Sequence, residues 1–366
     1  MTDTSKSINN PKYKIDLSLN KYKSRYERLL NILFYSKELP TDLYTQMNMT
    51  NINFKKTISI LNQRGIVKCI YTSDTKGYIL TTKGKQLTRY HQYKKYRNCL
   101  DSERRQYDLP HRQRKRQFAY LYALLDRTGI TYEDFLKPSI DKVIISDNNV
   151  YFYRALDFKR MLGIDATIFN GSKSLGFFIG RGKIVPVYRT NQLLRSFAIS
   201  EAKVPEYIKK IFKIPVNEAV LICESDKAAA DITNQLLQRS NIKTSSKINM
   251  VKYRNFYVFP SDDSFLSYYN DLYADHSRTI QTIIEQYRID TSTRDNRGNF
   301  RMLCGTGFIE NDPVLVYPGN IDIIRLKKYI RTVEREYNRG YIICKERDHE
   351  YMKVITQNTS IRIITI

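Results

Sequence analysis

The sequence predicts an α/β protein, α+β overall, in which a small helical module with a β-hairpin precedes a larger body of alternating strands and helices. Three observations support this fold class. Apolar residues recur first at helical and then at strand spacing in the first 84 residues, and strand and helix patterns alternate from Asp141 onward. Most of the excess positive charge falls in the first third of the chain. At 366 residues, the chain is long enough for two or three domains of about 100–200 residues.

Three helices are expected in the module. Apolar residues three and four apart predict an amphipathic helix over 21–34, after a loose polar start. Thr41 is a good N-cap for a short second helix over 43–47, and Asn53 can cap a third helix over 54–64. The third helix should turn its apolar residues inward and leave its polar residues outside.

A β-hairpin follows the third helix, which Gly65 ends. Two β-rich runs, 66–71 and 78–81, are joined by the polar turn 72–77. Three helices closed by a two-stranded ribbon are typical of a winged helix-turn-helix, which places its third helix in the major groove of double-stranded DNA and its wing near the phosphates. Residues 78–84 resemble the wing-to-helix ending of bacterial winged-helix proteins. Such modules sometimes bind proteins instead.

The charge distribution favours DNA as the partner. Residues 1–125 contain 25 Lys/Arg against 9 Asp/Glu, a balance of +16, and the remainder contains 36 against 28, a balance of +8, within a total of +24. Such a concentration of like charge is stabilised by a polyanion, and nucleic acid is the usual one. The alternative explanation of the charge excess is that the proteins of the host are basic in general and that these lysines are simply exposed to water.

The candidate DNA-contacting residues fall in three groups: the third helix, the wing, and the basic helical segment that follows the wing. They are Lys55, Lys56, Thr57, Asn62 and Gln63, then Lys68 and Lys76, then Arg112, Arg114, Lys115 and Arg116. Neutralising about six to eight phosphates would make log K fall with log salt at a slope of roughly −5 to −7.

The composition excludes several other classes of protein. Hydrophobic residues make up 42% of the chain and charged residues 27%, as in ordinary globular proteins. No run approaches the roughly 18 apolar residues of a membrane helix, and the first ten residues lack the apolar core of a signal peptide, so we expect a cytoplasmic protein without a membrane partner. The cysteines and histidines are scattered singly, so neither a disulfide framework nor a metal site is expected.

Strand and helix patterns alternate throughout the body. Strands are expected at 143–145, 166–169, 175–179, 184–188, 219–223, 256–259, 314–317, 341–344 and 361–366. Helices are expected at 228–237, 264–287 and 323–337. The expected domains are a flexible start 1–20, a winged helix-turn-helix 21–84, a basic helical linker 85–138, an α/β nuclease-like domain 139–289 and a C-terminal α/β subdomain 290–366.

Three segments carry a family resemblance. The run from His111 to Gly129, the strand-to-helix step 150–163 and the hairpin 180–188 resemble the replication-relaxation family of Gram-positive plasmids and integrative elements. That family is related to the class C mobilisation relaxases. The resemblance implies a restriction-endonuclease-like fold, in which an Asp and a D/E-x-K pair on neighbouring strands hold a divalent metal that activates water.

The chain departs from that metal-binding pattern. Asp157 and Lys159 form a D-x-K pair in a setting that reads as helical, whereas the chemistry needs both side chains on one face of a strand. Asp165 precedes a strand, yet the next hairpin, 180–189, has no acidic residue. We therefore interpret the body as a degenerate nuclease-like scaffold without a cofactor. Mg²⁺ or Mn²⁺ would be needed only if it nicks DNA, and a tyrosine nucleophile cannot be picked out among 29 tyrosines.

These observations predict a sequence-specific double-stranded DNA-binding protein of a mobile element, acting in plasmid replication, in mobilisation or conjugation, or in their regulation. Replication or conjugation proteins and a second copy of the chain are its possible partners. Two alternatives stay open. One is a relaxase-like enzyme that nicks origin DNA, and the other is a transcriptional regulator whose α/β body binds a ligand or partner.

Overall fold

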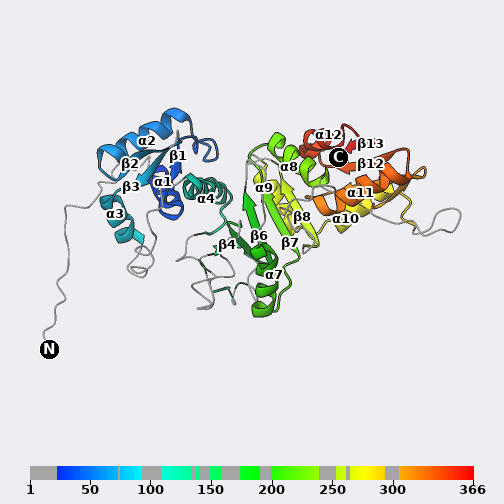
Figure 1. Cartoon of the computed structure of the whole chain (residues 1–366), viewed down its shortest axis with the longest axis horizontal. Helices are drawn as coiled ribbons and strands as arrows, with labels where there is room; N and C mark the ends of the chain where they lie inside the picture. The colour runs from blue at the N-terminus through cyan, green and yellow to red at the C-terminus, as the bar shows by residue number, and fades with distance from the viewer. Residues whose placement is uncertain are drawn as a thin grey trace. The chain divides into compact units, whose positions relative to one another are not determined.

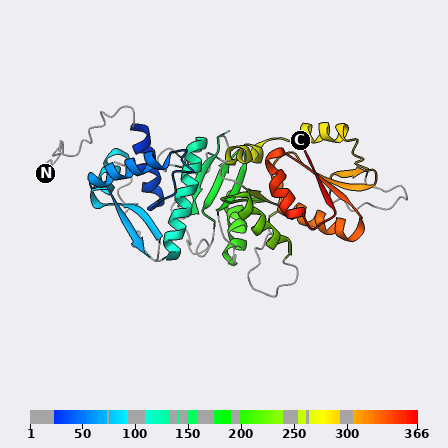
Figure 2. The same cartoon turned by 90° about the horizontal axis from the view of Figure 1, so that it is seen from above.

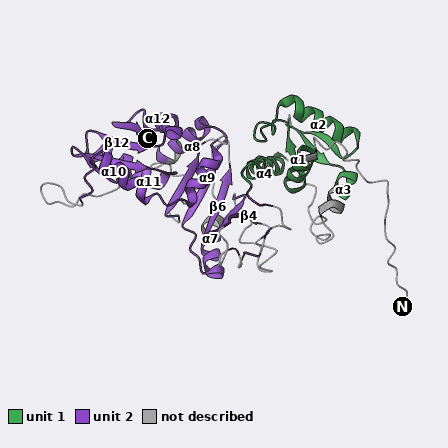
Figure 3. Cartoon of the chain, turned by 180° about the vertical axis from the view of Figure 1, so that it is seen from behind, with its two compact units in different colours: residues 1–129 green, residues 130–366 purple. Residues whose placement is uncertain are grey.

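The computed structural model describes residues 23–72, 75–92, 109–132, 137, 139–140, 143, 149–155, 157, 174–189, 199–238, 253–260, 264–292 and 305–366. The chain forms two compact units, Met1–Gly129 and Ile130–Ile366 (Figure 3). Each is a mixture of helices and β-sheet, so the predicted mixed α/β class is confirmed.

The first unit contains helices and a small antiparallel sheet with strand order β1-β3-β2 (Figure 1). Its elements are α1 Lys23–Ser36, β1 Leu39–Pro40, α2 Asn51–Gln63, β2 Val67–Thr72, β3 Thr75–Leu80, α3 Thr82–Gln92 and α4 Leu109–Thr128. Helix α4 lies against α1, and their buried apolar side chains form much of the core. The helix predicted from 21, the helix predicted from 54 and the hairpin are all present, with bounds shifted by one to three residues.

The second predicted helix, 43–47, is not formed. Residues 41–48 are turns instead, in which the N–H of Thr45 bonds the carbonyl of Asp42 at 3.3 Å and that of Met47 bonds Leu43 at 3.2 Å. The hydroxyl of Thr45 also donates to the carbonyl of Asp42, at 3.0 Å. Asn48, at φ 51°, then reverses the chain. A side chain that competes for backbone carbonyls and a left-handed residue together prevent a regular helix.

The second unit contains a six-stranded mixed sheet of order β11-β8-β7-β6-β5-β4 and a four-stranded sheet of order β13-β12-β10-β9. Its strands are β4 Tyr151–Arg154, β5 Gly176–Gly180, β6 Lys183–Arg189, β7 Glu218–Ile222, β8 Asn255–Phe259, β9 Gly307–Ile309, β10 Asp312–Tyr317, β11 Ile321–Asp322, β12 Gly340–Cys344 and β13 Ile361–Thr365. Its helices are α7 Ile199–Phe212, α8 Asp226–Gln238, α9 Phe265–Tyr273, α10 Ser277–Gln286, α11 Ile323–Glu336 and α12 His349–Thr356, with a 3₁₀ turn Glu346–Asp348.

In the larger sheet, β4, β5 and β6 form an antiparallel meander, after which β6, β7 and β8 run parallel. Helices α7 and α8 make the two crossovers that parallel neighbours require. One face of the sheet belongs to the main core, and α9 covers the other, where Phe178 meets Tyr269 and Phe259 stacks on Tyr268. The strands carry apolar side chains on both faces of the sheet, as expected for a sheet that is covered on both faces.

The smaller sheet is also covered on both faces. Strands β10, β12 and β13 are parallel, and β9 joins the antiparallel edge. Along β10, Val314 and Val316 pack with Ile283 of α10, whereas Leu315 and Tyr317 face the main core with α11 and α12. The two-residue alternation of a strand accounts for this division.

Some sequence predictions for the body need correction. The helix predicted over 264–287 is two helices, because Ala274, Asp275 and His276 interrupt it. Helices α7 and α12 were not predicted. The strand predicted at 166–169 lies outside the described residues. Of the strand predicted at 143–145 only Val143 is described, and it is helical instead, because its N–H bonds the carbonyl of Ser139 at 3.2 Å. Among the described residues, no helix is long and apolar enough to cross a membrane.

Candidate nucleic-acid interface

Helix α2 is fixed at both ends by its own sequence. Thr50, in the extended conformation, is the N-cap, and its hydroxyl accepts a hydrogen bond from the N–H of Asn53 at 3.2 Å, so the cap lies three residues before the predicted Asn53. At the other end Gly65 has φ 67°, and the N–H of Ile66 bonds the carbonyl of Leu61 at 2.9 Å. This is a Schellman ending, and it confirms Gly65 as the stop.

The outward face of α2 presents a mixed basic and amide surface. Lys55, Lys56, Asn62 and Gln63 are all exposed, as predicted. Thr57 is not. It is 6% exposed, it belongs to the buried stripe, and its hydroxyl donates to the carbonyl of Asn53 at 2.8 Å. Thr57 is therefore removed from the set of exposed candidate contacts.

The hairpin adds exposed cations beside this helix. Lys68 of β2 and Lys76 of β3 are both exposed. Lys76 pairs in register with Tyr71, a residue that is 67% exposed. The side of the hairpin near its turn thus offers a cation and an aromatic ring to solvent.

Arg112, a predicted DNA contact, is instead buried inside the module. It is 0% exposed, and its Nη2 lies 2.7 Å from Oε1 of Glu38, which is itself 1% exposed. Its Nη1 donates to the carbonyls of Thr72 and Thr75, at 3.2 and 2.9 Å. These carbonyls are the last of β2 and the first of β3, so Arg112 ties α4 to both strands of the hairpin. Figure 2 shows the ribbons of the first unit from above, with the hairpin in light blue and α4 in turquoise.

The carboxylate of Glu38 reaches Arg112 past a glycine. A Cβ placed on Gly77 would lie 2.5 Å from Oε1 of Glu38, so only glycine allows β3 to approach this carboxylate so closely. Arg112 and Glu38 therefore form a buried ion pair for which β3 leaves space.

The remaining candidates on α4 differ in exposure. Arg114 is exposed and Lys115 is partly exposed. The side chain of Arg116 is 18% exposed, and its Nη1 donates to the carbonyl of Lys76 at 2.9 Å, which adds a second link from α4 to the hairpin. The basic stretch 93–108 lies outside the described residues.

In the second unit, Asp157 is a buried acid engaged by two cations. Its carboxylate lies 2.8 Å from Nζ of Lys137 and 3.0 Å from Nη2 of Arg154, and it accepts the backbone N–H of Arg154 at 2.8 Å. Burial alone would raise the pKa of Asp157, but Arg154 and Lys137 outweigh it and hold the pKa well below its usual range. The contacts of Asp157 are those of a structural ion pair. Lys159 and Asp165 lie outside the described residues.

Ser225 follows β7 at the carboxyl edge of the larger sheet, where ligands of α/β proteins often bind. Its hydroxyl accepts the N–H of Ala228 at 3.3 Å, as a helix N-cap does. Beside it, Glu224 pairs with Arg189 at 3.1 Å. No group of three or more His, Cys, Asp or Glu that could hold a metal is found among the residues that the structure describes.

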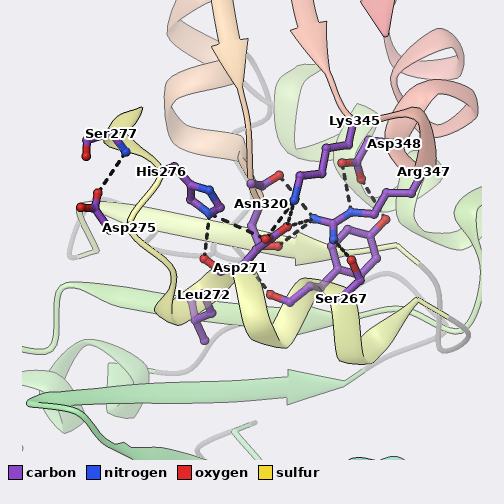
Figure 4. A network of polar contacts seen from close by, with 12 residues as sticks. Ser267, Asp271, Leu272, Asp275, His276, Ser277, Asn320, Lys345, Arg347 and Asp348 are labelled. Carbon is purple, nitrogen blue, oxygen red and sulfur yellow. Dashed lines mark hydrogen bonds and ion pairs between the residues drawn. The ribbon is translucent and has the colours of Figure 1, made fainter. Parts of the chain in front are cut away.

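A polar network lies at the carboxyl end of β12 (Figure 4). Asp271 of α9 lies 2.7 Å from Nζ of Lys345 and 2.6 Å from Nη2 of Arg347, and His276 lies on its other side, 3.8 Å away. Arg347 also covers the ring of Tyr268 at 4.0 Å. These contacts join α9 to the loop between β12 and α12.

Asp348 is the buried acid of this network. Tyr268 donates to its Oδ1 at 2.8 Å, and Nε of Arg347 lies 3.4 Å from its Oδ2. Burial raises the pKa of Asp348 to about 6, because it outweighs the stabilising effect of Arg347 and the hydrogen bond from Tyr268. Asp271 nearby also raises it.

This raised pKa predicts a pH-dependent contribution to stability. The folded pKa of Asp348 lies above the value of about 3.9 in an unfolded chain, so its contribution is full below pH ~4 and is lost as pH rises towards 6. We expect Asp348→Asn to destabilise the second unit more at pH 4 than at pH 7.5. Hydrogen exchange of α9 and α12 across this range measures the difference, and an equal effect of the substitution at both pH values would contradict the prediction.

A scan against protein-family models finds no match to this chain, and neither the search of curated proteins nor that of solved structures finds one.

Proposed function

We propose that the first unit is a winged helix-turn-helix module that binds double-stranded DNA in a sequence-specific manner. The observation that carries the proposal is the charge of α2, the hairpin and α3: residues 51–92 contain eight Lys/Arg and a single acid, Asp74. The positive charges of such a surface repel one another, and binding to the phosphates of DNA relieves this repulsion.

The geometry of the unit supports this proposal. An α-helix fits the major groove of B-DNA, and α2 points exposed lysine and amide side chains away from its core. Lys56 and Lys55 can reach phosphates, and Asn62 and Gln63 carry the amides that pair with adenine. The hairpin, held by Arg112 and Arg116, presents Lys76 as the second contact expected of a wing.

For the body we propose a nuclease-like scaffold that supports binding rather than cleavage. The resemblance to the replication-relaxation family motivates this part of the proposal, together with the meander β4–β5–β6 that passes into a parallel strand. Strands β5 and β6, where that chemistry would place its acids, carry no carboxylate in this chain. Asp157 is engaged by Lys137 and Arg154. The chain would then act in replication or mobilisation of a mobile element, or in its regulation.

Crosslinking of the full-length protein to DNA in its host, followed by sequencing of the bound fragments, tests the proposed role. The proposal predicts a small number of sharp sites that share one motif and lie at a replication or transfer origin or at an operator. Recovery of DNA without any shared motif would contradict sequence-specific binding. A nicked strand at the recovered site would overturn the proposal that the body does not cleave.

A further inference from the structure

The exposed face of α2 carries one large apolar side chain, Ile52, near the start of the helix. Ile52 lies nine residues before Leu61, a rotation of about half a turn at 3.6 residues per turn, so it points directly away from the buried stripe. Ile52 is 79% exposed. Ser59 and Gln63 continue the same line at helical spacing, and both are exposed.

The surroundings of Ile52 indicate what could cover it. Lys55 and Lys56 lie one turn further along α2, and α2 itself has no acidic residue. A partner that covers Ile52 therefore brings negative charge and an apolar group together. Duplex DNA meets both conditions, because the C5-methyl group of thymine is the apolar group of the major groove and lies between the phosphate backbones.

Two other outward residues of α2 also suit A·T pairs. The exposed amides Asn62 and Gln63 match the paired donor and acceptor of adenine, whereas Lys55 and Lys56 can bind either a phosphate or guanine. Ile52 and the two amides are therefore the side chains of this face that suit A·T pairs.

We propose that Ile52 determines specificity by contacting the C5-methyl group of a thymine, so that the module selects A·T pairs where the start of α2 enters the major groove. This inference rests on the proposed function, because it requires α2 to lie in that groove.

The test uses the full-length protein and a library of random 30-base-pair duplexes. Selection for binding gives a motif, and each thymine of the motif is then replaced by deoxyuridine, which lacks only the methyl group. At one thymine position, the wild type should lose about fourfold in affinity, the amount expected for one buried methyl. Ile52→Ala should bind the thymine and deoxyuridine duplexes equally.

Lys56→Ala is the matched control on the same face. It should weaken binding to both duplexes while leaving the thymine-to-deoxyuridine ratio of the wild type unchanged. If Ile52→Ala keeps that ratio, or if no thymine of the motif is sensitive, the inference is wrong, although DNA binding itself stands. If no duplex is retained at all, both the inference and the proposed function are overturned.

Discussion

Replacing Lys55 and Lys56 together by alanine is expected to lower the affinity of the full-length protein for its duplex roughly 50-fold at 0.1 M salt. Both side chains are exposed on α2. If each neutralises one phosphate, their loss reduces the salt slope by about two and removes the counterion release that drives binding at low salt. Fluorescence anisotropy with a labelled duplex at several salt concentrations measures both effects.

Lys209 and Lys210 offer a matched control for this pair. They are also adjacent exposed lysines, near the end of α7 in the second unit, so their replacement removes the same charge without touching α2. Their alanine variant should bind nearly as the wild type does. Equal losses in the two double variants would show that total charge, and not the face of α2, drives binding.

Arg112→Met is expected to destabilise the first unit by about 3 kcal/mol, because it removes the buried cation bonded to the carboxylate of Glu38 and leaves only Arg116, whose Nη1 lies 3.9 Å away. The substitution also removes the donor shared by the carbonyls of Thr72 and Thr75. Hydrogen exchange of α1 and α4, compared with that of the second unit, reports the loss. Adding Glu38→Leu should recover part of it, since an apolar pair leaves no buried charge.

Arg112 should also matter for DNA binding through the hairpin. If it holds the hairpin where Lys76 can reach a phosphate, then Lys76→Ala should weaken binding in the wild type but much less in the Arg112→Met/Glu38→Leu protein. Additive effects of these substitutions would mean that Arg112 stabilises the fold alone and has no part in positioning the hairpin.

The elements of the first unit that depend on local signals could be predicted from the sequence. Gly65 ends α2 through a left-handed conformation that other residues rarely adopt, and β-rich runs around a polar turn form the hairpin. The inward positions Phe54, Ile58 and Leu61 of α2 are buried as expected. Lys55, Lys56, Asn62 and Gln63 are exposed for the same reason, because a helix with one apolar stripe must expose its opposite face.

Features that depend on distant partners could not be predicted. Arg112 reads as one cation among many, and its burial follows from Glu38, which lies 74 residues away in the chain. The two-residue strands β1 and β11 have no pattern of their own and exist because longer neighbours pair with them. The interruption at 274–276 gives no clear helix-breaking signal, since apolar periodicity continues on both sides of it.

In the body, the buried strands were the most predictable elements, because sheets covered on both faces need continuous apolar runs. Residues 219–223 and 341–344 were identified within one residue of β7 and β12. The ion pair between Asp157 and Lys137 has no signal in the sequence, since Lys137 lies 20 residues away in the chain. A D-x-K pattern alone does not show whether its aspartate forms ion pairs with lysine or arginine side chains elsewhere in the chain.

The salt dependence of duplex binding by the full-length protein tests the central claim most directly. A titration from 0.05 to 0.3 M salt with the selected 30-base-pair duplex should give a line of log K against log salt with a slope of roughly −5 to −7. A slope near zero, or no binding at 0.05 M salt, would contradict the claim that the first unit binds DNA by contacting its phosphates.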